Sequence, residues 1–141
     1  MAGSLDNLTK LATQFRQLIE NADWSKLTVE FEDFPAGSCG DASILLAQYL
    51  IDAGYETPTY VSAELARPPN LPSHAWIELD GVILDITADG FEPSMPSVVV
   101  TENSEWRDQF NRLDEHPAAI HLYDDRTVAM LRPAYHEIIG R

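Results

Sequence analysis

Residues 74–87 read His-Ala-Trp-Ile-Glu-Leu-Asp-Gly-Val-Ile-Leu-Asp-Ile-Thr, and this stretch decides the expected fold. Asp80 and Gly81 form the dipeptide that a two-residue β-hairpin turn prefers, and apolar, strand-forming residues flank it on both sides. A turn of this kind pairs Leu79 with Val82 and fixes the register of every pair further out. We therefore predict two adjacent antiparallel strands over residues 74–79 and 82–87.

The register of this hairpin divides its side chains between two unlike faces, because opposed residues share a face and successive residues alternate. One face is wholly apolar and carries Ala75, Ile77, Leu79, Val82, Leu84 and Ile86. The other is mixed and carries His74, Trp76, Glu78, Ile83, Asp85 and Thr87. His74 and Asp85 are diagonal neighbours there, roughly 7 to 8 Å apart at the backbone, which an imidazole and a carboxylate can bridge. A slip of one residue would destroy this division, so the pattern supports the register.

The rest of the chain predicts helices first and then strands. Apolar residues at three- and four-residue steps indicate one amphipathic helix over residues 5–19 and a second from Cys39 to Gly54, with Ser38 and Asp41 as a capping box. Further strands are expected over residues 59–63, 97–101 and 118–123, a helix marked by Trp106, Phe110 and Leu113, a turn at Asp89 and Gly90, and a Pro-rich loop over residues 67–72. This order predicts one α+β domain over residues 1–141, with N-terminal helices packed on an antiparallel β-sheet.

Composition narrows the function classes. The chain has 141 residues with nine Lys+Arg and 23 Asp+Glu, giving a formal net charge of −14. This balance disfavours nucleic acid or an anionic membrane as partner, because both require clustered cations. No apolar run has the roughly 18 to 20 residues of a membrane span, and the N-terminus does not resemble a signal peptide. We expect a cytoplasmic protein, with secretion by a route without a cleaved signal left open.

Acidity is concentrated in residues 38–90, where Arg67 is the only cation, so a basic peptide is the favoured substrate.

Cys39 is the single cysteine, so it is either a small buried hydrophobe or a reactive thiol. At the first position of a helix it meets the positive end of the helix dipole, which favours the thiolate. It also lies on the stripe by which its helix should pack, facing the mixed face of the hairpin. We predict Cys39 as nucleophile, His74 as its base and Asp85 as the group that orients His74. The Cys39 backbone N–H is the expected first oxyanion donor, and the second is another backbone N–H or the Trp76 indole.

These residues resemble a known family. Gly37-Ser38-Cys39 opening an apolar helix, then His74-Ala75-Trp76-Ile77-Glu78, then Asp85 is similar to the core of the transglutaminase-like superfamily of papain-related cysteine enzymes. That superfamily includes transglutaminases, proteases, glutamine deamidases and the small leader peptidases of lasso-peptide biosynthesis. The resemblance covers about residues 34–91 and implies a transglutaminase-like, papain-like core and the same roles for the three residues. Gly40 follows the nucleophile where many transglutaminases have Trp, which disfavours cross-linking. Gly40 and Trp76 remain candidates for substrate or oxyanion contacts.

The sequence thus predicts a cysteine-dependent amide hydrolase, a peptidase or glutamine deamidase that acts on a peptide or protein through a covalent thioester. No cofactor is expected, and the other three histidines are too scattered for a metal site. The loop over residues 64–73 is a candidate gate for substrate. Two alternatives stay open: acyl transfer to an amine, and a non-catalytic binding or immunity module that keeps the fold. Substrate and oligomeric state stay undetermined.

Overall fold

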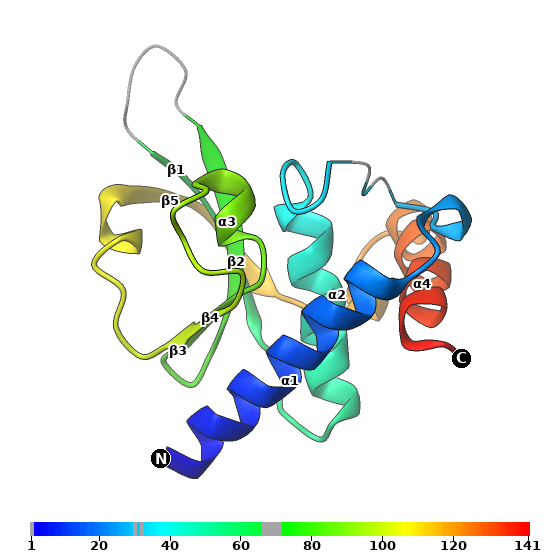
Figure 1. The fold of residues 1–141 in the computed structure, drawn as a ribbon, viewed down its shortest axis with the longest axis horizontal. Helices are drawn as coiled ribbons and strands as arrows, with labels where there is room; N and C mark the ends of the chain where they lie inside the picture. Colours follow the sequence, from blue (N-terminus) through cyan, green and yellow to red (C-terminus); the bar gives the residue numbers. More distant parts are fainter. Residues whose placement is uncertain (1, 30, 32, 66–71) are drawn as a thin grey trace.

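The computed structural model describes residues 2–29, 31, 33–65 and 72–141. Its helices lie mainly on one side of a five-stranded antiparallel sheet (Figure 1). The helices are α1 (Ala2–Asn21), α2 (Cys39–Asp52), α3 (Ala88–Phe91) and α4 (Asp125–Ile139), with single 3₁₀ turns η1 (Trp24–Lys26), η2 (Arg107–Gln109) and η3 (Ile120–Leu122). The strands are β1 (Thr59–Leu65), β2 (Ser73–Leu79), β3 (Val82–Asp85), β4 (Val99–Thr101) and β5 (Phe110–Pro117), in the spatial order β4-β3-β2-β1-β5. The coarse α+β prediction is confirmed.

The predicted hairpin is present in the predicted register. Leu79 pairs with Val82 and Ile77 pairs with Leu84. Asp80 and Gly81 both have positive φ, at 50° and 79°. That combination is the I′ turn, whose twist matches that of the flanking strands.

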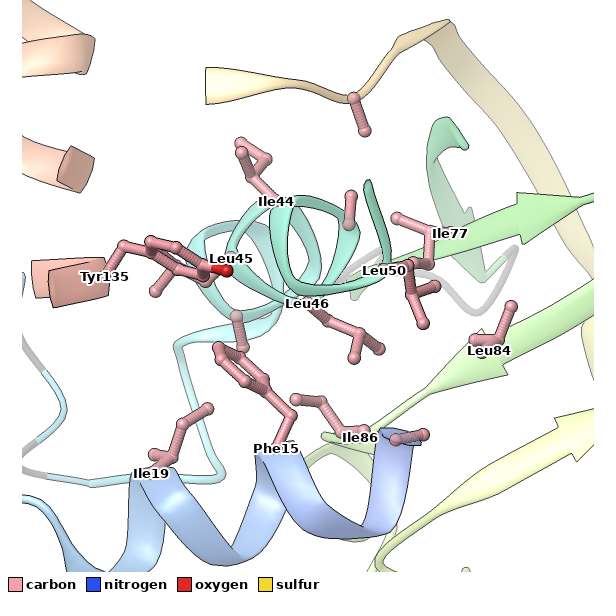
Figure 2. Packing of buried hydrophobic residues seen from close by; sticks show 14 of the residues in the cluster. Phe15, Ile19, Ile44, Leu45, Leu46, Leu50, Ile77, Leu84, Ile86 and Tyr135 are labelled. Atoms are coloured by element: carbon pink, nitrogen blue, oxygen red, sulfur yellow. The ribbon is translucent and has the colours of Figure 1, made fainter. Parts of the chain in front are cut away.

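The two faces of the sheet bury two separate apolar clusters. On the helical side, Ile77, Leu84 and Ile86 lie in one apolar cluster with α1 and α2, and α4 packs on these two helices (Figure 2). On the opposite side lies a smaller and largely aromatic cluster, formed by Val61, Ala63, Leu65, Trp76 and Phe110, with Ile83, Phe91 and Trp106 packed against it. Both faces are therefore covered, although only one of them is covered by long helices.

The two N-terminal helices form where their apolar periodicity predicts. In α1, the stripe is buried at Leu8, Ala12, Phe15 and Ile19. Helix α2 begins at Cys39 as predicted.

The expected capping box at the start of α2 is wrong. The Ser38 side chain makes no cap bond, and its hydroxyl donates instead to the Pro35 carbonyl at 3.3 Å. Asp41 lies in the first helical turn, and burial raises the pKa of its carboxyl. The hydroxyl is therefore used to shape the loop before α2, and the first turn of that helix lacks a side-chain cap.

Two expectations in the C-terminal third are also wrong. The segment with Phe110 and Leu113 is strand β5, because its backbone pairs with the edge of β1, and Leu113 is exposed. Residues 118–123, expected as a strand, contain the 3₁₀ turn η3. Helix α4 was not predicted at all, and it buries Leu131, Ala134, Tyr135 and Ile138. Sheet pairing decided the conformation of β5 over its helix-like spacing.

The expected turn at Asp89 and Gly90 is the short helix α3. The candidate gating loop joins β1 to β2, and its residues 66–71 lie outside the described residues. The same is true of residues 67–71 of the Pro-rich segment. No helix in the described ranges combines the length and apolarity that a membrane span requires.

Candidate active site

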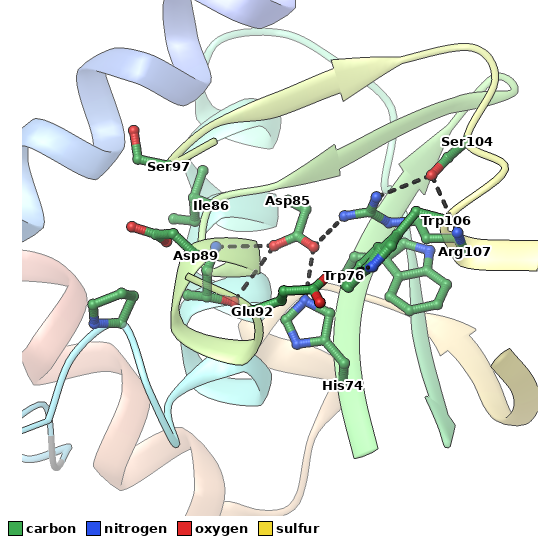
Figure 3. Close-up of polar contacts among 12 residues, drawn as sticks. His74, Trp76, Asp85, Ile86, Asp89, Glu92, Ser97, Ser104, Trp106 and Arg107 are labelled. Atoms are coloured by element: carbon green, nitrogen blue, oxygen red, sulfur yellow. Dashed lines mark hydrogen bonds and ion pairs between the residues drawn. The ribbon is translucent and has the colours of Figure 1, made fainter. Parts of the chain in front are cut away.

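Three elements bring together the residues predicted to act in catalysis. His74 is at the start of β2, Asp85 ends β3, and Cys39 begins α2. His74 Nε2 lies 2.7 Å from Asp85 Oδ2, with both side chains almost fully buried (Figure 3). The diagonal contact expected from the hairpin register is therefore present. It leaves Nδ1 as the ring nitrogen available to Cys39.

His74 interacts with Cys39 more loosely than with Asp85. Burial by itself lowers the pKa of His74, but hydrogen bonding and charge from Asp85 and from Cys39 raise it to about 9. The contact with Cys39 does not have the geometry of a full hydrogen bond, whereas that with Asp85 does. Loose nucleophile–base contacts are common before substrate binds.

Asp85 is held by several donors. One of its oxygens accepts from the Thr87 backbone N–H at 2.9 Å, and the other accepts from His74 and from Arg107. Burial alone raises the pKa of this carboxyl, but His74, Arg107 and Thr87 outweigh burial and hold the pKa below its ordinary value. Asp85 is therefore a carboxylate at neutral pH, suited to orient the Nε2–H of His74.

Cys39 and His74 line one small cavity, whose volume is about 230 Å³. The remaining wall is neutral and comes from Pro35, Gly37, Ser73, Thr87, Gly90 and Phe91. Gly90 is needed for this wall because a Cβ there would lie 2.3 Å from the Pro35 carbonyl. The loop before α2 thus packs directly on α3, and the cavity lies between them and the catalytic candidates.

The prediction that α2 faces the mixed side of the hairpin is wrong. Its buried side chains pack on the apolar side, against Ile77 and Leu84. His74 and Asp85 lie on the other side, and only the N-terminal end of α2 reaches the cavity shared with His74. Cys39 therefore meets His74 at the end of the sheet, without lying across its face.

Arg107 is a further residue of the site that the sequence did not indicate. Its guanidinium bonds to Asp85, donates to Ser104 Oγ at 3.1 Å, and lies 5.2 Å and 4.9 Å from the ring centres of Trp76 and Trp106. Its Nε is buried without a partner among the described residues. Burial lowers the pKa of Arg107 and Asp85 opposes that effect. The guanidinium stays a cation at neutral pH, because the ordinary pKa of arginine is far above 7.

Trp76 and Gly40, the two candidates for substrate or oxyanion contacts, have different surroundings in the structure. Trp76 is 1% exposed, and its indole N–H donates to Glu78 at 3.0 Å, so it is not free to bind a substrate oxygen. A Cβ on Gly40 would lie 3.2 Å from the Tyr60 hydroxyl, which therefore reaches the first turn of α2. That hydroxyl forms no hydrogen bond with another described residue. Burial and the nearby Cys39, Asp41 and Asp114 raise the pKa of Tyr60 to about 12, so it remains a donor at neutral pH.

A second buried arginine fixes the segment that carries α3. Arg16 of α1 forms a two-pronged contact with Asp89, at 2.8 Å and 3.0 Å, and donates to the Ile86 carbonyl at 2.8 Å. Its neighbours raise its pKa although burial opposes them. This contact holds the segment after β3, including Thr87 and Gly90, against α1.

Among the described residues, no three His, Cys, Asp or Glu side chains are grouped so that they could hold a metal ion. Comparisons with protein-family models, with curated proteins and with solved structures found nothing that matches this chain.

Proposed function

We propose that this protein is a cysteine-dependent amide hydrolase with a transglutaminase-like, papain-like core, acting as a peptidase or glutamine deamidase. The observation that carries the proposal is the connection from Cys39 through His74 to Asp85, beside a cavity at the N-terminal end of α2. A nucleophile, a base and a group orienting that base are the parts that acyl transfer needs. An ordinary packing role for Cys39 does not account for a buried His–carboxylate pair next to it.

The reaction follows from these positions. The Cys39 thiol gives its proton to His74, and the sulfur attacks the amide carbonyl carbon, forming a C–S bond and an oxyanion. When the oxyanion collapses, the C–N bond breaks and His74 gives the proton to the leaving amine. Water then attacks the thioester while His74 takes one of its protons, and the acid is released as the thiol is restored. Asp85 stabilises the imidazolium in each half of the reaction.

The oxyanion needs two donors, and two groups of this chain are suitably placed. The first is the Cys39 backbone N–H at the uncapped start of α2. The second, in place of Trp76, is the Tyr60 hydroxyl beside Gly40. Both are proposals, as is the preference for basic peptides that the net charge of −14 favours.

A small ester tests the covalent step without knowledge of the natural substrate. With p-nitrophenyl acetate, we expect release of p-nitrophenolate and a mass increase of one acetyl group, located on Cys39 by peptide mapping. Cys39→Ser should abolish the adduct, and His74→Asn should slow its formation by about 10² to 10⁴-fold, as loss of a general base does. Tyr60→Phe should slow acylation, yet leave alkylation by iodoacetamide unchanged, because alkylation forms no oxyanion.

The same assay separates the alternatives. An added primary amine that captures the acetyl group faster than water does would favour acyl transfer over hydrolysis. A folded protein whose Cys39 reacts with neither reagent faster than a free thiol would contradict the proposal and favour the binding module.

A further inference from the structure

We propose that Arg107 is a positioning residue for the reaction, which acts through Asp85 to set how strongly His74 and Cys39 hold their protons. The inference rests on the proposed function and adds to it a residue outside the family's three-residue pattern. The Arg107 guanidinium contacts Asp85 and not the reacting atoms, so its effect is indirect.

The guanidinium is fixed in place from several directions. Trp76 and Trp106 lie within cation–π distance of it, and Ser104 accepts from its Nη1 (Figure 3). Its side chain is 3% exposed and that of Asp85 1% exposed. The charge of Arg107 therefore acts on Asp85 with little screening by water.

The charged groups around the site form one connected set. His74 faces Asp85 of β3 and Cys39 of α2, and the rings of Trp76, Phe91 and Trp106 lie beside its own ring. Asp85 faces His74 and Arg107, and Arg107 faces Asp85 and Glu78 of β2. Arg107 is thus the permanent cation of this set.

Arg107 changes how far Asp85 depends on His74 for a compensating positive charge. A buried carboxylate requires a compensating positive charge. Because Arg107 supplies one, His74 is free to give up its proton during the reaction while Asp85 stays compensated. Without Arg107, His74 would be the remaining cation beside Asp85 and would hold its proton more strongly. The Cys39 thiol would also ionise less readily, because one positive charge would be lost from the set that His74 joins to Cys39.

The test measures the rate of Cys39 alkylation by iodoacetamide against pH, together with the NMR titration of the His74 ring. In the wild type, we expect two rises in rate, one as the thiolate–imidazolium pair forms and one as His74 loses its proton. In Arg107→Met, both midpoints should move to higher pH, by about one unit, because loss of a cation favours every neighbouring protonated form. Arg107→Lys keeps the positive charge, so both of its midpoints should lie close to the wild-type values.

Arg132→Met is the matched control, because it removes the same charge from an exposed arginine of α4, an element that carries no member of this set. Its midpoints should stay at the wild-type values. If Arg107→Met does not fold, Ser104→Ala replaces it, since loss of the Ser104 acceptor loosens the guanidinium and should give a smaller shift of the same sign.

The outcomes distinguish the two proposals. Wild-type labelling that does not depend on His74 would contradict the proposed function itself. A normal wild-type profile, with midpoints unmoved in folded Arg107→Met or Ser104→Ala, would overturn only the role of Arg107.

Discussion

Both faces of the sheet are buried, but the side chains on them differ in kind. The helical face packs mainly aliphatic side chains such as Leu84 against α1 and α2. The opposite face buries His74, Asp85 and Arg107 beneath aromatic rings, among them Trp76 and Trp106. Flat rings exclude water from charged groups while offering favourable contact to a cation. The comparison shows that one face stabilises the domain by burial alone and the other builds a charged site inside it.

The largest expected difference between the faces comes from substitutions that keep side-chain volume. Asp85→Asn leaves Arg107 buried without its counter-charge and should lower the free energy of unfolding by about 3 to 5 kcal/mol. Leu84→Met, one residue earlier and on the helical face, should cost less than about 1.5 kcal/mol. Urea unfolding of both variants measures the difference.

A double variant shows whether charge is the cause. Asp85→Asn combined with Arg107→Met removes both ions, so it should be more stable than Asp85→Asn alone. Equal destabilisation of Leu84→Met and Asp85→Asn would contradict the distinction between the faces.

The second difference is a dependence of stability on pH. Only the face opposite the helices, which carries His74, should produce it. The pKa of His74 is about 9 in the folded protein against an ordinary value of 6.5. A raised pKa stabilises the folded state below pH 6.5, and this contribution is lost as pH rises through about 9. The loss should reach up to about 3 kcal/mol, from 1.36 kcal/mol per pH unit. Urea unfolding at pH 6 and pH 9.5 measures it.

The control for this dependence is a variant on each face. His74→Asn should remove most of the fall in stability, whereas Leu84→Met should retain it. A wild-type stability that stays level between these pH values would contradict the raised pKa of His74.

The smallest expected effect on stability comes from the N-terminal caps of two helices, α4 and α2, on the helical side of the sheet. At α4, the Asp124 carboxylate accepts from the Thr127 N–H at 2.8 Å, and Asp124→Ala should lower the free energy of unfolding by removing this cap. At α2, Ser38 makes no cap bond, so Ser38→Ala should cost less than half as much in the free energy of unfolding. Thermal unfolding compares the two, and equal losses would show that Ser38 caps α2 in solution.

The predictions from sequence failed where distant parts of the chain meet. The hairpin around Asp80 and Gly81 was predictable because a two-residue turn fixes its own register. Strand β5 was not predictable, since its conformation comes from pairing with β1, about 50 residues earlier in the chain. The packing of Trp76 was not predictable for the same reason, because its partner Phe110 comes from β5.

The sequence by itself determined the hairpin, the two N-terminal helices and the closeness of His74 to Asp85, because each depends on local periodicity or on one turn. Only the tertiary structure decided that Cys39 meets His74 at the end of the sheet and that Arg107 compensates Asp85. In sequence, the acidic stretch over residues 38–90 has Arg67 as its only cation. Folding brings Arg16 and Arg107 to Asp89 and Asp85 of that stretch, because sheet pairing and helix packing join segments that are far apart in the chain.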